Sequence, residues 1–183
     1  YYSHRDWVNI ISVKRDYEFI LRLDDDSHLA PDYIERLMNV LDKGYDLATG
    51  VVPATGASNI RRDPKFISNK IVNRVILDDQ GNYILNNDDC GMPYLESVIL
   101  PAHHFRSCAL YKTELHKNGV NYTPTRLSKH GFREEQIFSY RALMKGYKLG
   151  CDTGAIAWHL MTPSGGERFA DSNELIKLNE EIM

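Results

Sequence analysis

The apolar positions near the start of the chain follow two different patterns. Residues 5–13 have helical spacing, whereas residues 17–23 (YEFILRL) are apolar almost throughout and predict a strand. A strand apolar on both faces is typical of a central parallel strand, which we expect here. A helix is expected from Pro31 to Lys43, because proline suits a first turn and apolar residues then recur at helical spacing. With residues 45–52 as the next strand, the order indicates a layered α/β domain.

The rest of the chain is less regular but contains recognisable elements. Glycines and prolines interrupt residues 53–105, and a turn at residues 79–81 predicts a hairpin between residues 75–77 and 83–85. Further along the chain we expect a buried strand at residues 107–111, a helix at 134–145, a pair of short strands within 147–158 and a helix within 171–183.

Composition and charge narrow the classes of function. The 183 residues suit one domain, and a hydrophobic fraction of 43% predicts a packed core. A net charge of -3 gives no electrostatic case for nucleic acid as a partner. The apolar runs are too short to span a bilayer, which still allows peripheral contact with a membrane. Three widely spaced cysteines without a CxxC pair favour buried thiols in a reduced, cytoplasmic protein.

Three consecutive aspartates follow the first predicted strand, in the stretch LRLDDDSHL. Alternate residues of an extended chain point the same way, so Asp24 and Asp26 can share a ligand while Asp25 points elsewhere. Paired carboxylates at a strand end suit Mg²⁺ or Mn²⁺, especially a metal ion shared with phosphates. The simpler interpretation is a solvated turn that leads into the next helix.

Two other types of acidic loop were compared with this stretch. A helix-loop-helix calcium site needs an oxygen ligand at its fifth position and glycine at its sixth, where this chain has His28 and Leu29. That type is therefore excluded. A phosphatase of the haloacid-dehalogenase type would use Asp24 as nucleophile and Asp26 as acid, with Lys70 and the Asp78–Asp79 pair downstream. This alternative is retained.

A second polar constellation begins at the helix expected from residue 134. Glu134 and Glu135 lie at its start, where the helix dipole alone would favour acidic side chains. Arg141 lies six residues beyond Glu135, in position for an ion pair at the edge of the core. His159 follows a short apolar stretch and becomes a candidate metal ligand once an acidic pair lies elsewhere in the chain.

Taken together, these motifs resemble the second half of a family 2 glycosyltransferase of the GT-A type. FILRLDDDSHLAPDYIERLMNVL is similar to the family's apolar strand that ends in D-x-D and leads to a proline-started helix. EEQIFSYRALMKGY is similar to its acidic pair with an arginine and a Gly-Tyr at fixed spacing, and His159 matches its closing histidine. The matches fall in order over about residues 5–160.

The resemblance implies a GT-A-like, Rossmann-related mixed sheet flanked by helices. In that family a whole β-α-β-α half precedes D-x-D, but only about twenty residues precede Asp24 here. We therefore expect the N-terminal nucleotide-binding half to be truncated, and the chain alone to bind donor poorly, to self-associate or to need a partner. The expected single partial domain consists of residues 1–52 with D-x-D, the donor- and acceptor-side strands and loops of 53–131, the acidic-pair helix and histidine strand of 132–160, and the loop and helix of 161–183.

The resemblance also implies an activity. It predicts inverting transfer of a sugar from a nucleotide-sugar, most simply a UDP-sugar, to an acceptor hydroxyl, with Mn²⁺ or Mg²⁺ stabilising the diphosphate. Asp24 would lie near the ribose or reach the metal through water, Asp26 and His159 would bind the metal, and Asp25 would turn away or reach the donor sugar. Glu135 would be the general base. The family usually has Asp at that position, so Glu134 stays an alternative base.

Other parts of the donor and acceptor sites are expected from loops. In residues 162–168 the Arg168 side chain, with backbone N–H groups of Gly165 and Gly166, would close on the pyrophosphate. Residues 53–105 and 118–131 would contact the acceptor, a glycan, a lipid or a small molecule, and candidates for that wall are Tyr122, Arg126, His130 and Phe132. A third hypothesis is a catalytically silent module with the transferase fold.

Overall fold

A computed structural model describes residues 8, 10, 14, 16–24, 27–52, 75–77, 83–85, 97–106, 108–122 and 134–159, with the backbone alone described at 75–77, 83–85 and 159. Its elements are β1 (Phe19–Arg22), β2 (Ser27–Leu29), α2 (Tyr33–Asp42), β3 (Leu47–Val51), β4 (Val75–Leu77), β5 (Tyr83–Leu85), β6 (Ile99–Pro101), β7 (Ala109–Lys112), α3 (Glu114–Lys117), α4 (Glu134–Met144) and β8 (Leu149–His159). Among the described helices, none has the length and apolar character needed to cross a membrane.

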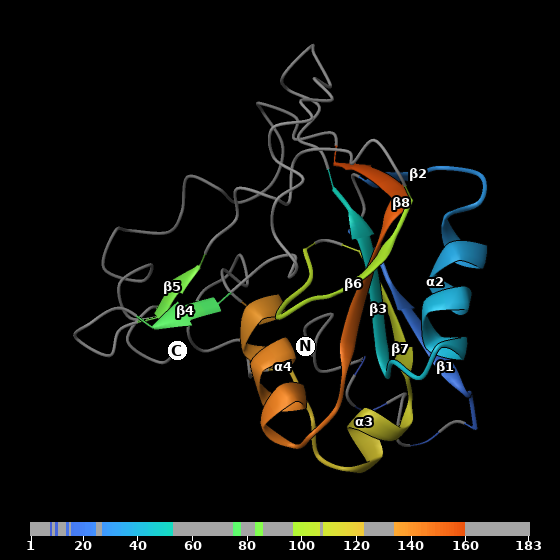
Figure 1. The fold of residues 1–183 in the computed structure, drawn as a ribbon. Coiled ribbons are helices and arrows are strands. Elements are labelled where there is room, and N and C mark those ends of the chain that lie inside the picture. Colours follow the sequence, from blue (N-terminus) through green and yellow to red (C-terminus); the bar gives the residue numbers. More distant parts are fainter. Residues whose placement is uncertain are drawn as a thin grey trace, which may run out of the picture.

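A mixed sheet forms the centre of the described fold (Figure 1). Its strand order is β1-β7-β3-β8-β2, and β6 also pairs with β8. The β3–β8 pair is parallel, whereas β1–β7, β3–β7, β2–β8 and β6–β8 are antiparallel. Strands β4 and β5 pair with each other in a separate antiparallel hairpin, as predicted from the turn between them.

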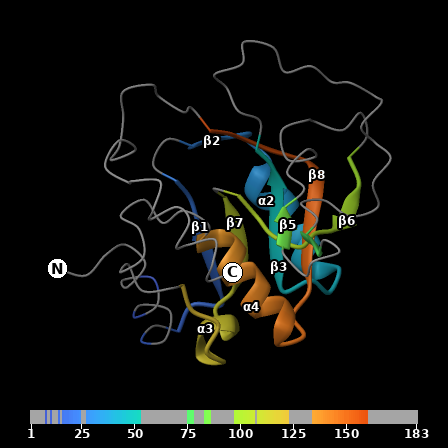
Figure 2. The same cartoon turned by 90° about the vertical axis from the view of Figure 1, so that its left-hand side faces the viewer.

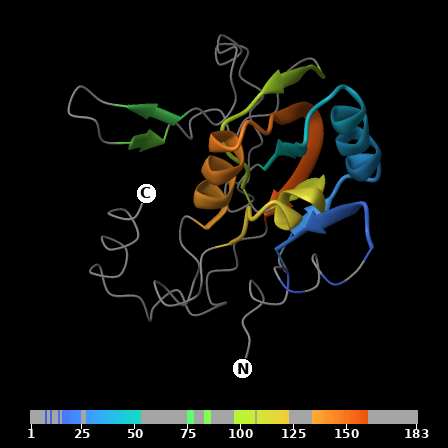
Figure 3. The ribbon, with the colours of Figure 1, turned by 90° about the horizontal axis from the view of Figure 1, so that it is seen from below.

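Helices cover both faces of this sheet, with α2 on one side and α4 on the other (Figures 1 and 3). Alternate residues of a strand point to opposite faces, and β3 shows this directly. Leu47 and Val51 join the core beneath α4, and Ala48 joins the core beneath α2. The predicted α/β class is therefore confirmed, with a mixed sheet between helical layers.

The prediction that residues 17–23 form a central parallel strand is wrong for the described sheet. Strand β1 lies at one end of the strand order and pairs with β7 in antiparallel orientation. Ile20 packs against the core beneath α4, while Phe19 and Leu21 pack against the core beneath α2. The apolar pattern thus reported burial on both faces, which carries no information about the direction of the neighbouring strand.

Residues 149–159 form one long strand where a pair of short strands was expected. The register between β3 and β8 shifts from Gly50↔Asp152 to Val51↔Ile156, so β8 carries an irregularity within one continuous strand. Polar groups in the middle of this strand have partners there. The backbone N–H of Thr153 donates to the Val98 carbonyl, and the Asp152 carboxylate accepts from Gly154 N–H.

Gly50 lies at this irregularity, where β3 and β8 approach closely. A Cβ atom at this position would lie directly against the Ala155 carbonyl oxygen and 2.7 Å from the Tyr33 ring. Because both neighbours belong to the buried core, Gly50→Ala should lower the free energy of unfolding by about 1–3 kcal/mol, measured by urea denaturation. Ala48→Gly is the control, since it removes a methyl group from the same strand without a clash. If Gly50→Ala left stability unchanged, the close approach would be wrong.

The two described cysteines agree with the prediction from composition. Cys108 and Cys151 are buried, and neither of these two described cysteines is in a disulfide. Burial raises the pKa of the Cys108 thiol above its usual value, so this group stays protonated near neutral pH. Both side chains therefore act as small apolar groups of the core.

Candidate active site

Three carboxylates from distant parts of the sequence contact the guanidinium of Arg22. Its Nη1 lies 2.9 Å from Asp24 Oδ1, and its Nη2 lies 2.9 Å from Oε1 of both Glu134 and Glu135. Asp24 lies two residues beyond the end of β1, whereas the two glutamates begin α4 about 110 residues later. The two acidic motifs predicted from the sequence therefore meet at one place. We call Arg22, Asp24, Glu134 and Glu135 the Arg22 cluster.

The strand and the helix dictate how these side chains are presented. Arg22 and Asp24 are two positions apart in an extended segment, so they point to the same side. Glu134 and Glu135 lie in the first turn of α4, where the helix dipole stabilises carboxylates. The Arg22 guanidinium also lies over the Phe105 ring, 5.9 Å from its centroid, which adds a cation–π contact.

The Arg22 cluster is largely removed from solvent. The side-chain exposure is 7% for Arg22, 11% for Glu134, 17% for Glu135 and 26% for Asp24. Solvent reaches the cluster mainly on the side of Asp24 and Glu135. A reacting group would therefore approach from that side, while Arg22 and Glu134 lie deeper.

Burial and the oppositely charged ion-pair partner act in opposite directions on the pKa values of Glu135 and Arg22. Burial raises the pKa of Glu135, and the negative charges of Glu134 and Asp24 raise it further, while Arg22 opposes them. The net result is a pKa above that of an ordinary glutamate. Burial lowers the pKa of Arg22, but the carboxylates, led by Glu135, outweigh it, so its pKa is raised and the guanidinium stays charged.

An aromatic layer supports the cluster from the core. The Tyr122 ring stacks on Phe138 with centroids 4.4 Å apart and an angle of 14° between the planes. Tyr122 is only 3% exposed, so the suggestion that it lines an acceptor wall is wrong. The sequence indicated an aromatic residue in a loop but gave no sign that α4 would cover it. Arg126, His130 and Phe132 lie outside the described residues.

The end of β8 lies beside the segment that follows the aspartates. His159 pairs with Ser27 in the β2–β8 ladder, and the Ser27 N–H donates to the Asp24 carbonyl over 3.1 Å. Figure 2 shows β2 running along the end of β8. The backbone of the predicted metal-ligand histidine therefore lies close in the sheet to the predicted acidic motif.

Several predicted site residues stay untested by the described structure. Asp25, Asp26, Gly165, Gly166 and Arg168 lie outside the described residues, as do Lys70 and the Asp78–Asp79 pair of the phosphatase alternative. The described side chains contain no group of three or more His, Cys, Asp or Glu residues that could hold a metal. Asp24 is the one predicted metal ligand whose side chain is described.

Arg141 donates to a backbone carbonyl among the described residues. Its Nη1 donates to the Asn121 carbonyl over 2.9 Å, so within the described residues it fixes the chain that follows α3 against α4. The arginine that does contact the acidic pair is Arg22, to which the sequence motifs assign no role. Its signal was a lone charge in an apolar strand, two residues before Asp24, which favours a buried partner for that charge.

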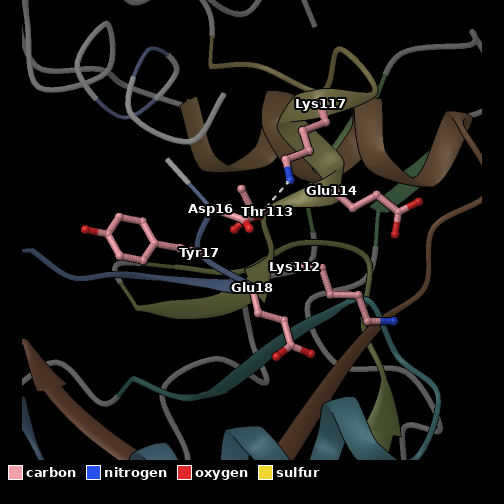
Figure 4. Close-up of a pocket in the computed structure, with 7 residues that line it drawn as sticks. All are labelled: Asp16, Tyr17, Glu18, Lys112, Thr113, Glu114 and Lys117. Atoms are coloured by element: carbon pink, nitrogen blue, oxygen red, sulfur yellow. Dashed lines mark ion pairs between the residues drawn. The ribbon is translucent and has the colours of Figure 1, made fainter. Parts of the chain in front are cut away.

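A separate hollow lies at the other end of β1. Its volume is about 550 Å³, and it is lined by Asp16, Tyr17, Glu18, Lys112, Thr113, Glu114 and Lys117. Figure 4 shows side chains of both charges around it, with Asp16 and Lys117 paired over 3.8 Å. Asp24 lies beyond one end of β1, and Glu18, which lines the hollow, lies just before the other end. The hollow is therefore separate from the Arg22 cluster.

Comparisons with known proteins found no matching family model and no similar curated protein. Membership of a glycosyltransferase family therefore stays a prediction based on the motifs.

Proposed function

We propose that the protein is an inverting glycosyltransferase that moves a sugar from a nucleotide-sugar to an acceptor hydroxyl. The observation that carries this proposal is the shared contact of Asp24 and Glu135 with Arg22. The resemblance assigns Asp24 to the donor side and Glu135 to the acceptor side of one reaction. Their convergence from positions more than a hundred residues apart supports a common centre, which a solvated turn and an ordinary helix start would not require.

Glu135 is suited to the role of general base. A sugar hydroxyl is a poor nucleophile unless a base within hydrogen-bond reach removes its proton as it attacks. The raised pKa of Glu135 makes its carboxylate a stronger base than an ordinary glutamate. Its partial exposure, 17% against 11% for Glu134, favours Glu135 as the residue that an acceptor reaches.

The charge of the cluster fits a divalent cation on its donor side. The described ion pairs place three carboxylates on one guanidinium, and Asp24, on the side where a cation would bind, is the most exposed of the three. Carboxylate oxygen is the ligand that Mg²⁺ and Mn²⁺ prefer. Asp24, Asp26 and His159 would hold the metal, which would neutralise the charge of the departing nucleoside diphosphate. Arg168 with Gly165 and Gly166 would contact the same diphosphate.

The pH dependence of transfer tests the assignment of the base. The rate of UDP release from a UDP-sugar with Mn²⁺ should reach its maximum above the pKa of Glu135. It should fall at lower pH, where that carboxylate becomes protonated. Because this pKa is raised, the acid limb of kcat should lie above the range of an ordinary glutamate. Glu134→Gln should move the limb to lower pH, since a neighbouring negative charge is lost. A limb that stays in place in Glu134→Gln would exclude Glu135 as the titrating base.

A further inference from the structure

We infer that Arg22 is a positioning residue that joins the two sides of the proposed site. It holds the base Glu135 and the donor-side Asp24 in one fixed geometry. This inference rests on the proposed function, and it gives a role to a residue to which the recognised motifs assign none.

The geometry of the guanidinium is what allows this role. Arg22 presents Nη1 to Asp24 and Nη2 to Glu134 and Glu135, each over 2.9 Å. The two nitrogen atoms belong to one planar group, so a shift of one carboxylate is transmitted to the others. The side chain is itself held in place by burial and by the Phe105 ring. Glu134 acts as the buried anchor of the guanidinium, which leaves the more exposed Glu135 for chemistry.

A lysine at this position would keep the charge but lose the geometry. An ammonium group is a single point on a flexible stem and lacks the fixed fork of donors that spans two directions. It can pair with Asp24 or with the glutamates, but it cannot fix their separation. Arg22→Lys therefore isolates the positioning role from the simple presence of a positive charge.

The kinetic test compares Arg22→Lys with Arg36→Lys in the full chain. Arg36 is a matched control because its Nε also pairs with an aspartate, Asp32, over 2.6 Å, but outside the Arg22 cluster. With a UDP-sugar and Mn²⁺, Arg22→Lys should lower kcat by about 10²-fold and also raise the KM for donor, because both sides of the site move. Kinetic constants equal to those of Arg36→Lys would overturn the inference.

Chemical rescue distinguishes a positioning role of Arg22 from a purely structural role. Arg22→Ala leaves a space among the three carboxylates that matches a free guanidinium ion. Guanidinium at millimolar concentration, which is too low to unfold the protein, should raise the activity of Arg22→Ala at least about tenfold. Methylammonium should not raise it. Equal effects of the two ions on the folded variant would overturn the inference. If Arg22→Ala does not fold, the Arg22→Lys comparison decides alone.

Thermal unfolding separates failure of this inference from failure of the proposed function. Arg22→Lys is combined in turn with Asp24→Asn and with Glu135→Gln, and the shifts in Tm are compared with the sums of the single changes. Non-additive shifts in both pairs are expected if one guanidinium joins the two carboxylates. Additive shifts would overturn the inference even if the enzyme transfers sugar. Coupling in a wild-type protein without transfer would instead count against the proposed function.

Discussion

Replacing Glu135 by glutamine should lower kcat by about 10²–10⁴-fold and leave the KM for donor within a few-fold of the wild-type value. The amide has the shape of the carboxylate but cannot take a proton from the acceptor hydroxyl. The donor would still be held by the residues on the side of Asp24. Steady-state kinetics with a UDP-sugar, Mn²⁺ and a panel of glycoside acceptors measures both constants.

Glu134→Gln is the matched control for this change. Glu134 contacts the same Arg22 nitrogen over the same 2.9 Å, and both glutamates lie in the first turn of α4. Loss of an ion pair with Arg22 is therefore common to the two variants, and loss of the base is specific to Glu135→Gln. We expect the smaller loss for Glu134→Gln. The reverse order of effects would identify Glu134 as the base.

Replacing Arg22 by methionine should lower the free energy of unfolding by about 3–5 kcal/mol at neutral pH. The change removes the positive charge that compensates three poorly exposed carboxylates, and an apolar side chain cannot satisfy them. Methionine is flexible and of similar length, so the effect of a cavity is kept small. Urea denaturation followed by circular dichroism measures the difference.

The pH dependence of this penalty identifies its cause. Without Arg22 the pKa of Glu135 in the folded state rises further above its value in the unfolded state, because Arg22 is the charge that lowers it. A raised carboxyl pKa favours the folded state at low pH, so the penalty should shrink as the pH falls through these values. Arg36→Met, at a side chain that is 34% exposed, should cost less than Arg22→Met, although it also removes a partner 3.5 Å from the buried Asp152. A penalty independent of pH would point to lost packing instead of lost charge compensation.

Local features of the fold followed from the sequence. The helix expected from Pro31 to Lys43 is α2, Tyr33–Asp42, because its apolar spacing and its ends are both encoded locally. The turn at residues 79–81 likewise predicted the β4–β5 pair. Strand order did not follow, because an apolar run such as that of β1 reports burial and not the identity of its neighbour. The continuity of β8 was missed because Asp152 and Thr153 find partners in the segment around Val98, far away in the sequence.

The candidate site could be predicted in its acidic members but not in the residue that joins them. Asp24 and the Glu134–Glu135 pair were selected from their motifs, and the described structure brings them together. Arg22 has no motif of its own. Its importance depends on the packing of α4 against the end of β1, which no local pattern encodes. A charged residue in an otherwise apolar strand was the available signal.

Inverting transfer is tested most directly by following the anomeric proton of a UDP-α-sugar by NMR, with Mn²⁺, the full chain and a panel of glycoside acceptors. We expect release of UDP and a β-linked product from the wild type. Asp24→Asn and Glu135→Gln should strongly reduce both signals, whereas Arg36→Lys should retain them. An α-linked product, or no transfer to any acceptor together with Asp24-dependent hydrolysis of a simple phosphate ester, would contradict this expectation.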